Sequence, residues 1–305
     1  MKYDLIIIGG GPAGMTAGIY ASRLGLKTLL ITKSFGGQIA KKAVGVENYP
    51  GFKSISGLEL VQKMEEHLKS QKVGIEMDEV RKVEKRNKNF LVSTKSKKEF
   101  QAKAVILASG ADPRPLEIPG EKEFIGKGVS YCSVCDGPIF RNKVVAVVGG
   151  GNAGFETAIF LTKIVKKIYI LEFGPEPKAF AANQEIVKKK GKAEIITNAA
   201  LKEIKGDKFV ESIIYEDRRT KKEKTLSVEG VFVEVGYQPA TAYVKGLVDF
   251  NERDEIKVEF ETCQTKTPGL FAAGDLNVGA VKQIVTAAGE GAKAALAAYN
   301  YVQNK

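Results

Sequence analysis

The sequence predicts an α/β fold with two Rossmann-like dinucleotide-binding domains, because one pattern of residues occurs twice along the chain. A glycine-rich turn stands at Gly9–Gly14, and a second one stands at Gly149–Gly154. An apolar strand precedes each turn, and a helix and a second strand follow it. In such a βαβ unit the glycines let the backbone approach a pyrophosphate, which the N-terminus of the helix faces.

Apolar runs and helical spacing place the elements of both copies. In the first copy we expect a strand at Tyr3–Ile8, a helix at Met15–Leu24 and a strand at Thr28–Ile31. In the second copy the corresponding elements are Val144–Val148, Phe155–Lys163 and Ile168–Leu171. A chain of 305 residues is long enough to hold both units as separate domains.

The two copies differ at the end of their second strand. Glu172 stands there in the second copy, where an acid accepts hydrogen bonds from an adenosine ribose, and Thr32 is its counterpart in the first. The stretch Pro268–Asp275 makes up for the missing acid of the first copy, because its Gly274-Asp275 pair can bring a carboxylate to the ribityl chain of a flavin. A helix from about Gln283 follows, and its N-terminus can support negative charge on a reduced flavin.

Two short proline-bearing stretches mark the domain boundaries. Gly110–Pro115 leaves the first unit, and Val235–Pro239 returns to it. We therefore expect a discontinuous flavin domain, residues 1–113 and 239–305, with a nicotinamide-binding domain at residues 114–238 inserted into it. Paired crossings of this kind are natural hinges.

A dithiol motif, Cys132-Ser133-Val134-Cys135, lies just ahead of the second glycine turn. A zinc site is disfavoured, because the remaining candidate ligands, Cys263 and His67, have no ligand-like spacing and a closed site needs four ligands. Three cysteines are also too few for a secreted disulfide framework. Two dinucleotide sites and one dithiol suggest that electrons pass from a nicotinamide to a flavin to a disulfide.

The net charge of +11 comes from scattered lysines such as Lys188-Lys189-Lys190. Few aromatic residues interleave with them, so solvated faces are favoured over a nucleic-acid site, and acidic partners are favoured over basic ones. The apolar run before Gly9 is too short for a signal peptide, and no run approaches the length of a membrane helix. We expect a cytoplasmic protein without a metal, nucleic-acid or membrane partner.

At this point the residues resemble a known family, the low-molecular-weight thioredoxin reductases. The resemblance covers nearly the whole chain and rests on Gly9–Gly14, Gly36-Gly37-Gln38, Glu47–Gly51, Cys132–Cys135 with Asp136-Gly137, Gly149–Gly154 and Gly274-Asp275. The stretch Leu171–Ala179 is closer to the flavoprotein subunit of alkyl hydroperoxide reductase. That relative carries an additional amino-terminal dithiol domain, whereas here Met1 leads straight into the flavin strand, and we expect the reductase core alone.

The resemblance implies which residues act in catalysis. Cys135 is the thiol that faces the flavin, Cys132 is the interchange thiol that attacks the partner, and Asp136 is the acid–base residue. High-molecular-weight disulfide reductases use a histidine near the carboxyl terminus, but the single histidine here, His67, lies on a charged helix and is expected at the surface. Cys263 has no second cysteine nearby and is expected to be a buried structural thiol.

The resemblance also implies the cofactor-binding residues. For FAD they are Gly9, Gly11, Pro12, Ala13, Gly14, Thr32, Gly37, Gln38, Asn48, Gly110, Gly274, Asp275, Lys282, Gln283 and Ile284. For NADH they are Gly149, Gly151, Asn152, Ala153, Gly154, Glu172, Phe173, Lys178 and Gly236. NADPH-dependent thioredoxin reductases carry a His-Arg-Arg run, with a further arginine downstream, to bind the 2′-phosphate. Glu172, Phe173 and Gly174 replace the run and Lys178 replaces the later arginine, so NADH is expected over NADPH.

Three functions compete. The favoured one is an NADH-dependent flavin disulfide reductase for a thioredoxin- or glutaredoxin-like carrier, which can serve a peroxiredoxin system and, by resemblance, forms a homodimer. The nicotinamide and the dithiol lie in one domain and need the same flavin face, so that domain is expected to rotate about its hinges. A second possibility is the same enzyme with another donor, such as ferredoxin or a reduced deazaflavin. A third is a non-catalytic redox sensor, for which the sequence offers no output surface.

Overall fold

The computed structural model describes residues 2–42, 45–279 and 281–304, which fold into two compact units. The terminal unit combines the chain up to Asp112 with the chain from Gln238 onward, and the inserted unit is Pro113–Tyr237. Both crossings fall within the proline-bearing stretches named above. There the strands β9 (Ala111–Pro113) and β18 (Tyr237–Pro239) pair with each other.

The terminal unit is built on a seven-stranded sheet in the order β5-β2-β1-β8-β7-β6, with β19 paired to β8. Strands β1, β2, β5, β8 and β19 are parallel, and β6 and β7 extend the sheet as an antiparallel hairpin. The strands are β1 (Lys2–Gly10), β2 (Thr28–Phe35), β5 (Val73–Met77), β6 (Val80–Arg86), β7 (Asn89–Thr94), β8 (Glu99–Leu107) and β19 (Leu270–Ala272).

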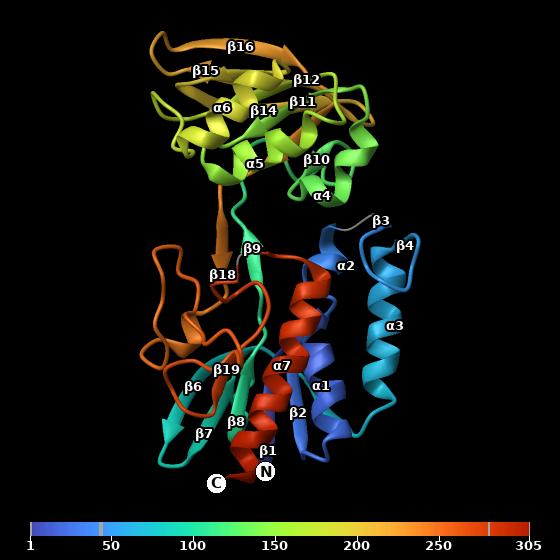
Figure 1. The fold of residues 1–305 in the computed structure, drawn as a ribbon, viewed down its shortest axis with the longest axis vertical. Helices are drawn as coiled ribbons and strands as arrows, with labels where there is room; N and C mark the ends of the chain where they lie inside the picture. The colour runs from blue at the N-terminus through green and yellow to red at the C-terminus, as the bar shows by residue number, and fades with distance from the viewer. Residues whose placement is uncertain (1, 43–44, 280, 305) are drawn as a thin grey trace. The chain divides into compact units, whose positions relative to one another are not determined.

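Helices cover one face of this sheet (Figure 1). Because successive side chains of a strand point to opposite faces, Leu5 and Ile7 of β1 pack against the helices, while Ile6 and Ile8 pack on the other face. The helices on this face are α1 (Pro12–Arg23), α3 (Gly57–Lys69) and α7 (Ile284–Gln303). The remaining short elements of the unit are α2 (Gln38–Lys42), β3 (Gly45–Val46), β4 (Ile55–Ser56) and η2 (Ala242–Val244).

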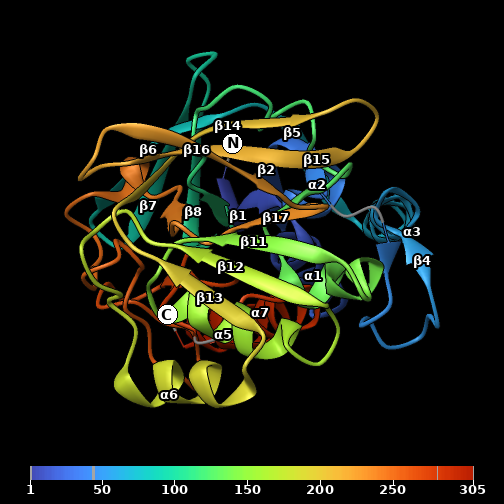
Figure 2. The same ribbon diagram turned by 90° about the horizontal axis from the view of Figure 1, so that it is seen from above.

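The inserted unit has a five-stranded parallel sheet in the order β10-β17-β11-β12-β13. Figure 2 shows α5 and α6 on one side of it and the antiparallel sheet β14-β15-β16 on the other, so both faces are buried. The elements are β10 (Val129–Ser130), α4 (Ser133–Asp136), η1 (Gly137–Phe140), β11 (Val144–Val148), α5 (Asn152–Leu161), β12 (Lys167–Leu171), α6 (Ala181–Lys190), β13 (Ala193–Ile196), β14 (Ala199–Gly206), β15 (Val210–Asp217), β16 (Lys222–Ser227) and β17 (Gly230–Val233).

Both glycine turns join a strand to a helix as the sequence predicts, but the helices begin three residues earlier than expected, at Pro12 and Asn152. The last glycine of each turn is therefore helical. A Cβ on Gly14 would lie 1.9 Å from the carbonyl oxygen of Gly9, so no larger residue fits there. The described residues include no helix long and apolar enough to cross a membrane.

Candidate redox and dinucleotide sites

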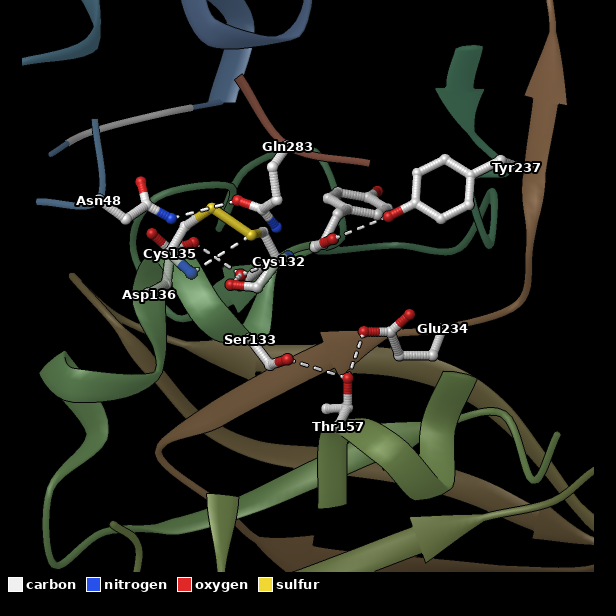
Figure 3. The surroundings of a disulfide bond; sticks show 11 residues. Asn48, Cys132, Ser133, Cys135, Asp136, Thr157, Glu234, Tyr237 and Gln283 are labelled. Carbon is white, nitrogen blue, oxygen red and sulfur yellow. Dashed lines mark hydrogen bonds between the residues drawn. A yellow bond between two sulfur atoms is a disulfide. The ribbon is translucent and has the colours of Figure 1, made fainter. Parts of the chain in front are cut away.

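Cys132 and Cys135 form a disulfide at the start of α4, with their Cα atoms 5.3 Å apart (Figure 3). Cys132 is the N-cap of this short helix, and its Sγ accepts a hydrogen bond from the backbone N–H of Cys135 at 3.2 Å. A donor aimed at a sulfur favours its anionic form. The structure therefore places a backbone donor on the sulfur of Cys132.

Asp136, directly after the disulfide, is half-buried. Burial raises the pKa of its carboxyl, and a hydrogen bond from Ser130 opposes that shift in part. The Ser130 hydroxyl donates to Asp136 at 2.6 Å and accepts from the N–H of Cys132 at 3.1 Å. One hydroxyl thus fixes the carboxyl relative to the dithiol, and a raised pKa lets that carboxyl hold a proton nearer neutral pH.

A second carboxyl, that of the half-buried Glu234, connects to the redox helix through two hydroxyls (Figure 3). The Thr157 hydroxyl donates to Glu234 at 2.7 Å and lies 3.0 Å from the hydroxyl of Ser133, the first residue of α4. Glu234 follows β17, and a Cβ on Gly149 would lie 2.3 Å from its carbonyl oxygen. The backbone of Glu234 therefore lies against the second glycine turn, while its carboxyl connects to the dithiol helix through Thr157 and Ser133.

Burial raises the pKa of Glu234 to about 7 from its ordinary value of 4.5, with a smaller contribution from the neighbouring Glu156. Because the unfolded chain loses this proton at lower pH, Glu234 destabilises the native state progressively between pH 4.5 and about 7. Relative to Glu234→Gln, the unmodified protein should lose about 3 kcal/mol of unfolding free energy over that range. Urea unfolding followed by circular dichroism at several pH values measures the difference, and parallel curves for the two proteins would contradict it.

The second glycine turn leaves room for a ligand. A Cβ on Gly151 would meet nothing within 4 Å, and no side chain caps the first turn of α5. The first N–H groups of such an uncapped helix start can bind a pyrophosphate. Asn152 is oriented by the N–H of Phe180, which donates to Asn152 Oδ1 at 2.7 Å. Ala153 and Gly154 continue the first turn of the helix.

Glu172 lies at the carboxyl end of β12, as expected, but its carboxylate already has two partners. One oxygen accepts from the N–H of Gly150 at 2.8 Å, and the other accepts from the N–H of Gly174 at 2.7 Å. Only 8% of the residue is exposed. The carboxylate is thus held in one orientation, and its remaining lone pairs are available to a ribose.

Phe173 and Lys178, also assigned to NADH, follow β12 in the chain, and Gly236 lies after β17. Phe173 is 60% exposed, Lys178 is exposed, and the backbone N–H of Lys178 donates to the carbonyl of Gly150. Gly236 has a φ of 104°, in the region that glycine adopts readily, where the chain approaches the crossing.

The first glycine turn, in the terminal unit, fits a second dinucleotide in the same way. Gly11 is the N-cap of α1 without a side-chain hydrogen bond, and a Cβ there would meet nothing within 4 Å. Pro12, Ala13 and Gly14 form the first turn of the helix. Thr32 lies in β2, and its hydroxyl donates to the carbonyl of Ser34 at 2.7 Å. Because Thr32 stands where an acid would be, this turn offers no carboxylate at this position of β2.

The expected flavin contacts from other segments include one unpaired polar atom. Gln38 donates to Asp112, but its Oε1 is buried without a partner among the described residues. Because buried polar atoms are normally hydrogen-bonded, this oxygen is suited to accept from a ligand. Asn48 donates to the side chain of Gln283 at 3.1 Å, and Gln283 caps α7 just ahead of Ile284. The remaining flavin positions with a positive φ are Gly9, Gly37, Gly110 and Gly274.

Asp275 follows β19 and is half-buried, and this burial raises its pKa to about 6. Its turn is held by Glu290 of α7, whose carboxylate accepts from the N–H of Gly274 at 2.7 Å and from the side chain of Asn277 at 2.8 Å. Lys282 forms a salt bridge of 3.1 Å with Glu255 next to this turn. The site residues assigned to FAD in this region thus lie on one rigid, hydrogen-bonded corner.

Two residues set apart from the sites behave as the sequence predicts. Cys263 is a buried free thiol whose pKa is raised to about 11 by burial, so it is an inert thiol at neutral pH. His67 is exposed on α3.

Glu234 and Glu290 were not found by sequence reasoning. Glu234 had one available signal, because it is an acid at the carboxyl end of a strand beside a glycine turn. Glu290 had none, since its role depends on how α7 packs against the Gly274 turn.

Two βαβ units with open glycine turns and one Cys-x-x-Cys disulfide define a class, the disulfide oxidoreductases built on two dinucleotide-binding units. Residues 3–291 match the family model described as pyridine nucleotide-disulphide oxidoreductase. The chain therefore belongs to the pyridine nucleotide-disulphide oxidoreductase family.

Similar proteins support this assignment. A Bacillus subtilis (strain 168) protein named NADH dehydrogenase is 40% identical over 301 residues, and a Staphylococcus epidermidis protein named as a subunit of alkyl hydroperoxide reductase is 39% identical over 302 residues. Each comparison covers 98% of this chain, which spans 58% and 59% of the length of these relatives. The crystal structure of thioredoxin reductase from Streptococcus pyogenes superposes with a TM-score of 0.93 at 37% identity and covers 100% of this chain and 99% of that one. The predicted fold class and the family resemblance are confirmed.

Proposed function

We propose that this protein is an NADH-dependent, FAD-containing disulfide reductase that passes electrons to a thioredoxin- or glutaredoxin-like protein. The observation that carries the proposal is the Cys132–Cys135 disulfide, whose backbone is hydrogen-bonded through Ser130 to the half-buried carboxyl of Asp136, on the unit that also holds an open glycine turn. The reaction balances as NADH, one proton and a disulfide giving NAD⁺ and a dithiol. FAD, when bound, supplies the relay between hydride transfer and thiol chemistry.

The chain's residues divide the thiol chemistry between them. Cys132, with the N–H of Cys135 aimed at its sulfur, is the thiolate that attacks the disulfide of the partner protein. The mixed disulfide is then broken by Cys135, which restores the Cys132–Cys135 bond and releases the partner as a dithiol. Asp136 holds the exchanged proton beside the dithiol, because burial raises its pKa.

NADH is favoured over NADPH by the fixed carboxylate of Glu172. Its two backbone donors hold it at the end of β12, where it accepts from the ribose hydroxyls and repels a 2′-phosphate. Lys178 offsets part of that repulsion but lacks the two-pronged fork of an arginine. The relative named as a subunit of alkyl hydroperoxide reductase points to a peroxiredoxin system as one setting for the carrier.

The remaining features of the proposal come from the family and the sequence. The protein acts as a homodimer in the cytoplasm, and it binds neither nucleic acid nor a membrane. Because the dithiol and the second glycine turn both belong to the inserted unit, they reach the flavin in alternation, by rotation about the two crossings.

Anaerobic stopped-flow mixing of the oxidised, FAD-loaded protein with NADH tests the donor. Rapid loss of flavin absorbance is expected with NADH, because the second glycine turn and Glu172 can bind it. A protein that is bleached by neither NADH nor NADPH, yet is reduced by ferredoxin or a reduced deazaflavin, would overturn the donor assignment and leave the dithiol role intact. A protein that retains no FAD after reconstitution would overturn the flavin assignment.

A further inference from the structure

The segment after β12 is held in place by two later turns of the inserted unit. The N–H of Asn198 donates to the carbonyl of Gly174 at 2.7 Å, and the N–H of Arg218 donates to the carbonyl of Asn198 at 2.8 Å. The N–H of Ala199 donates to the carbonyl of Glu172 at 2.9 Å. Three separate stretches therefore converge where the sequence places the adenosine ribose.

The side chain of Arg218 lies directly on this segment. Its Nη1 donates to the carbonyl oxygen of Phe173 at 2.9 Å, and its guanidinium carbon lies 3.8 Å from the centre of the Phe173 ring. A planar guanidinium stacks well on an aromatic face while its edge donates hydrogen bonds. No carboxylate of the described residues forms a salt bridge with Arg218, whereas the adjacent Arg219 pairs with Asp217 at 3.8 Å.

The carbonyl that Arg218 binds belongs to the same peptide unit as the N–H that binds Glu172. Phe173 contributes the C=O and Gly174 contributes the N–H, which donates to the Glu172 carboxylate at 2.7 Å. A cation at the oxygen end of a peptide polarises it and strengthens the hydrogen bond at the other end. The guanidinium therefore acts on the carboxylate through one peptide plane.

We propose that Arg218 is a positioning residue for nucleotide specificity, which holds Glu172 toward the ribose through the Phe173–Gly174 peptide. This inference rests on the proposed use of NADH. Loss of the guanidinium frees the peptide to rotate, and the carboxylate then loses the fixed orientation in which it accepts from a ribose 2′-hydroxyl. Discrimination against a 2′-phosphate falls as a consequence, although Arg218 itself does not touch the nucleotide.

Calorimetric titration of the FAD-loaded protein with ADP and with 2′,5′-ADP tests this without catalysis. The unmodified protein should bind ADP more tightly than 2′,5′-ADP. Arg218→Leu should lower the ratio of the 2′,5′-ADP dissociation constant to the ADP dissociation constant by about fivefold, chiefly by weakening the binding of ADP. Arg218→Lys, which keeps a cation able to reach the carbonyl, should retain the ratio within about twofold. Arg219→Leu is the matched control and should leave both constants unchanged, because that side chain pairs with Asp217 instead.

The outcomes separate the inference from the proposed function. An unchanged ratio in Arg218→Leu overturns the inference alone. A selective loss of 2′,5′-ADP binding overturns it as well, because Arg218 would then contact the phosphate directly. If Arg218→Leu does not fold, Arg218→Gln takes its place with a smaller expected decrease, and an unchanged ratio there overturns the inference equally. Failure of the unmodified protein to bind either nucleotide would instead overturn the proposed function.

Discussion

Replacement of Cys132 by serine should abolish electron transfer to any protein carrier while leaving reduction of the FAD-loaded protein by NADH intact. Carrier turnover should fall to on the order of one thousandth or less, because a serine hydroxyl neither forms nor exchanges a disulfide. Cys135→Ser should lose turnover to the same extent, since the mixed disulfide then has no resolving thiol. Turnover is measured with NADH held constant across a screen of thioredoxin- and glutaredoxin-like carriers.

Cys263→Ser is the matched control for this experiment. Cys263 is buried and its pKa is raised to about 11, so its thiol takes no part in exchange at neutral pH. Turnover should stay almost unchanged. If Cys132→Ser keeps carrier turnover, the interchange role is wrongly assigned. A matching loss in Cys263→Ser would mean that the losses reflect packing and not chemistry.

The second large effect concerns the choice of nucleotide. A carboxylate about 4 Å from a phosphate costs roughly 4 kcal/mol at an effective dielectric of about 20, and Lys178 offsets part of this. A net penalty of about 2–3 kcal/mol corresponds to on the order of 30- to 150-fold preference for NADH in kcat/KM. The triple variant Glu172→His, Phe173→Arg and Gly174→Arg should raise NADPH use and weaken NADH use. It removes the repulsion and supplies charge-assisted contacts to phosphate.

Steady-state kcat/KM for both nucleotides measures this preference. The structure adds a constraint, because the Glu172 carboxylate also satisfies the N–H groups of Gly150 and Gly174. The triple variant should therefore also unfold more easily than the unmodified protein. If the unmodified protein uses NADPH as well as NADH, Glu172 does not face the ribose. If it uses neither nucleotide, the hypothesis of another donor, such as ferredoxin or a reduced deazaflavin, is favoured. The Gly149–Gly154 turn would then be an element of the fold that no longer binds a nucleotide.

The local pattern of the sequence determined the βαβ units. The apolar run before Gly9, the glycine spacing and the same order at Gly149 follow from local sterics, since only glycine fits where a Cβ would overlap a carbonyl oxygen. The helix starts were misplaced by three residues, because propensity assigns glycine and proline to a turn whereas the tight strand–helix packing makes them helical. The dithiol was equally evident, since its two cysteines are close in sequence.

Contacts between distant segments were decided only by the tertiary structure. Ser133, Thr157 and Glu234 meet because α4, α5 and the end of β17 pack together. Arg218 reaches Phe173 because the turn between β15 and β16 lies against the segment that follows β12. No local sequence pattern predicts these long-range side-chain contacts, because they depend on strand order and on the register of β14 with β15. The sequence alone thus determined which chemistry this protein carries, and the fold decided which side chains hold its reacting groups in place, because that requires burial and hydrogen-bond partners from remote parts of the chain.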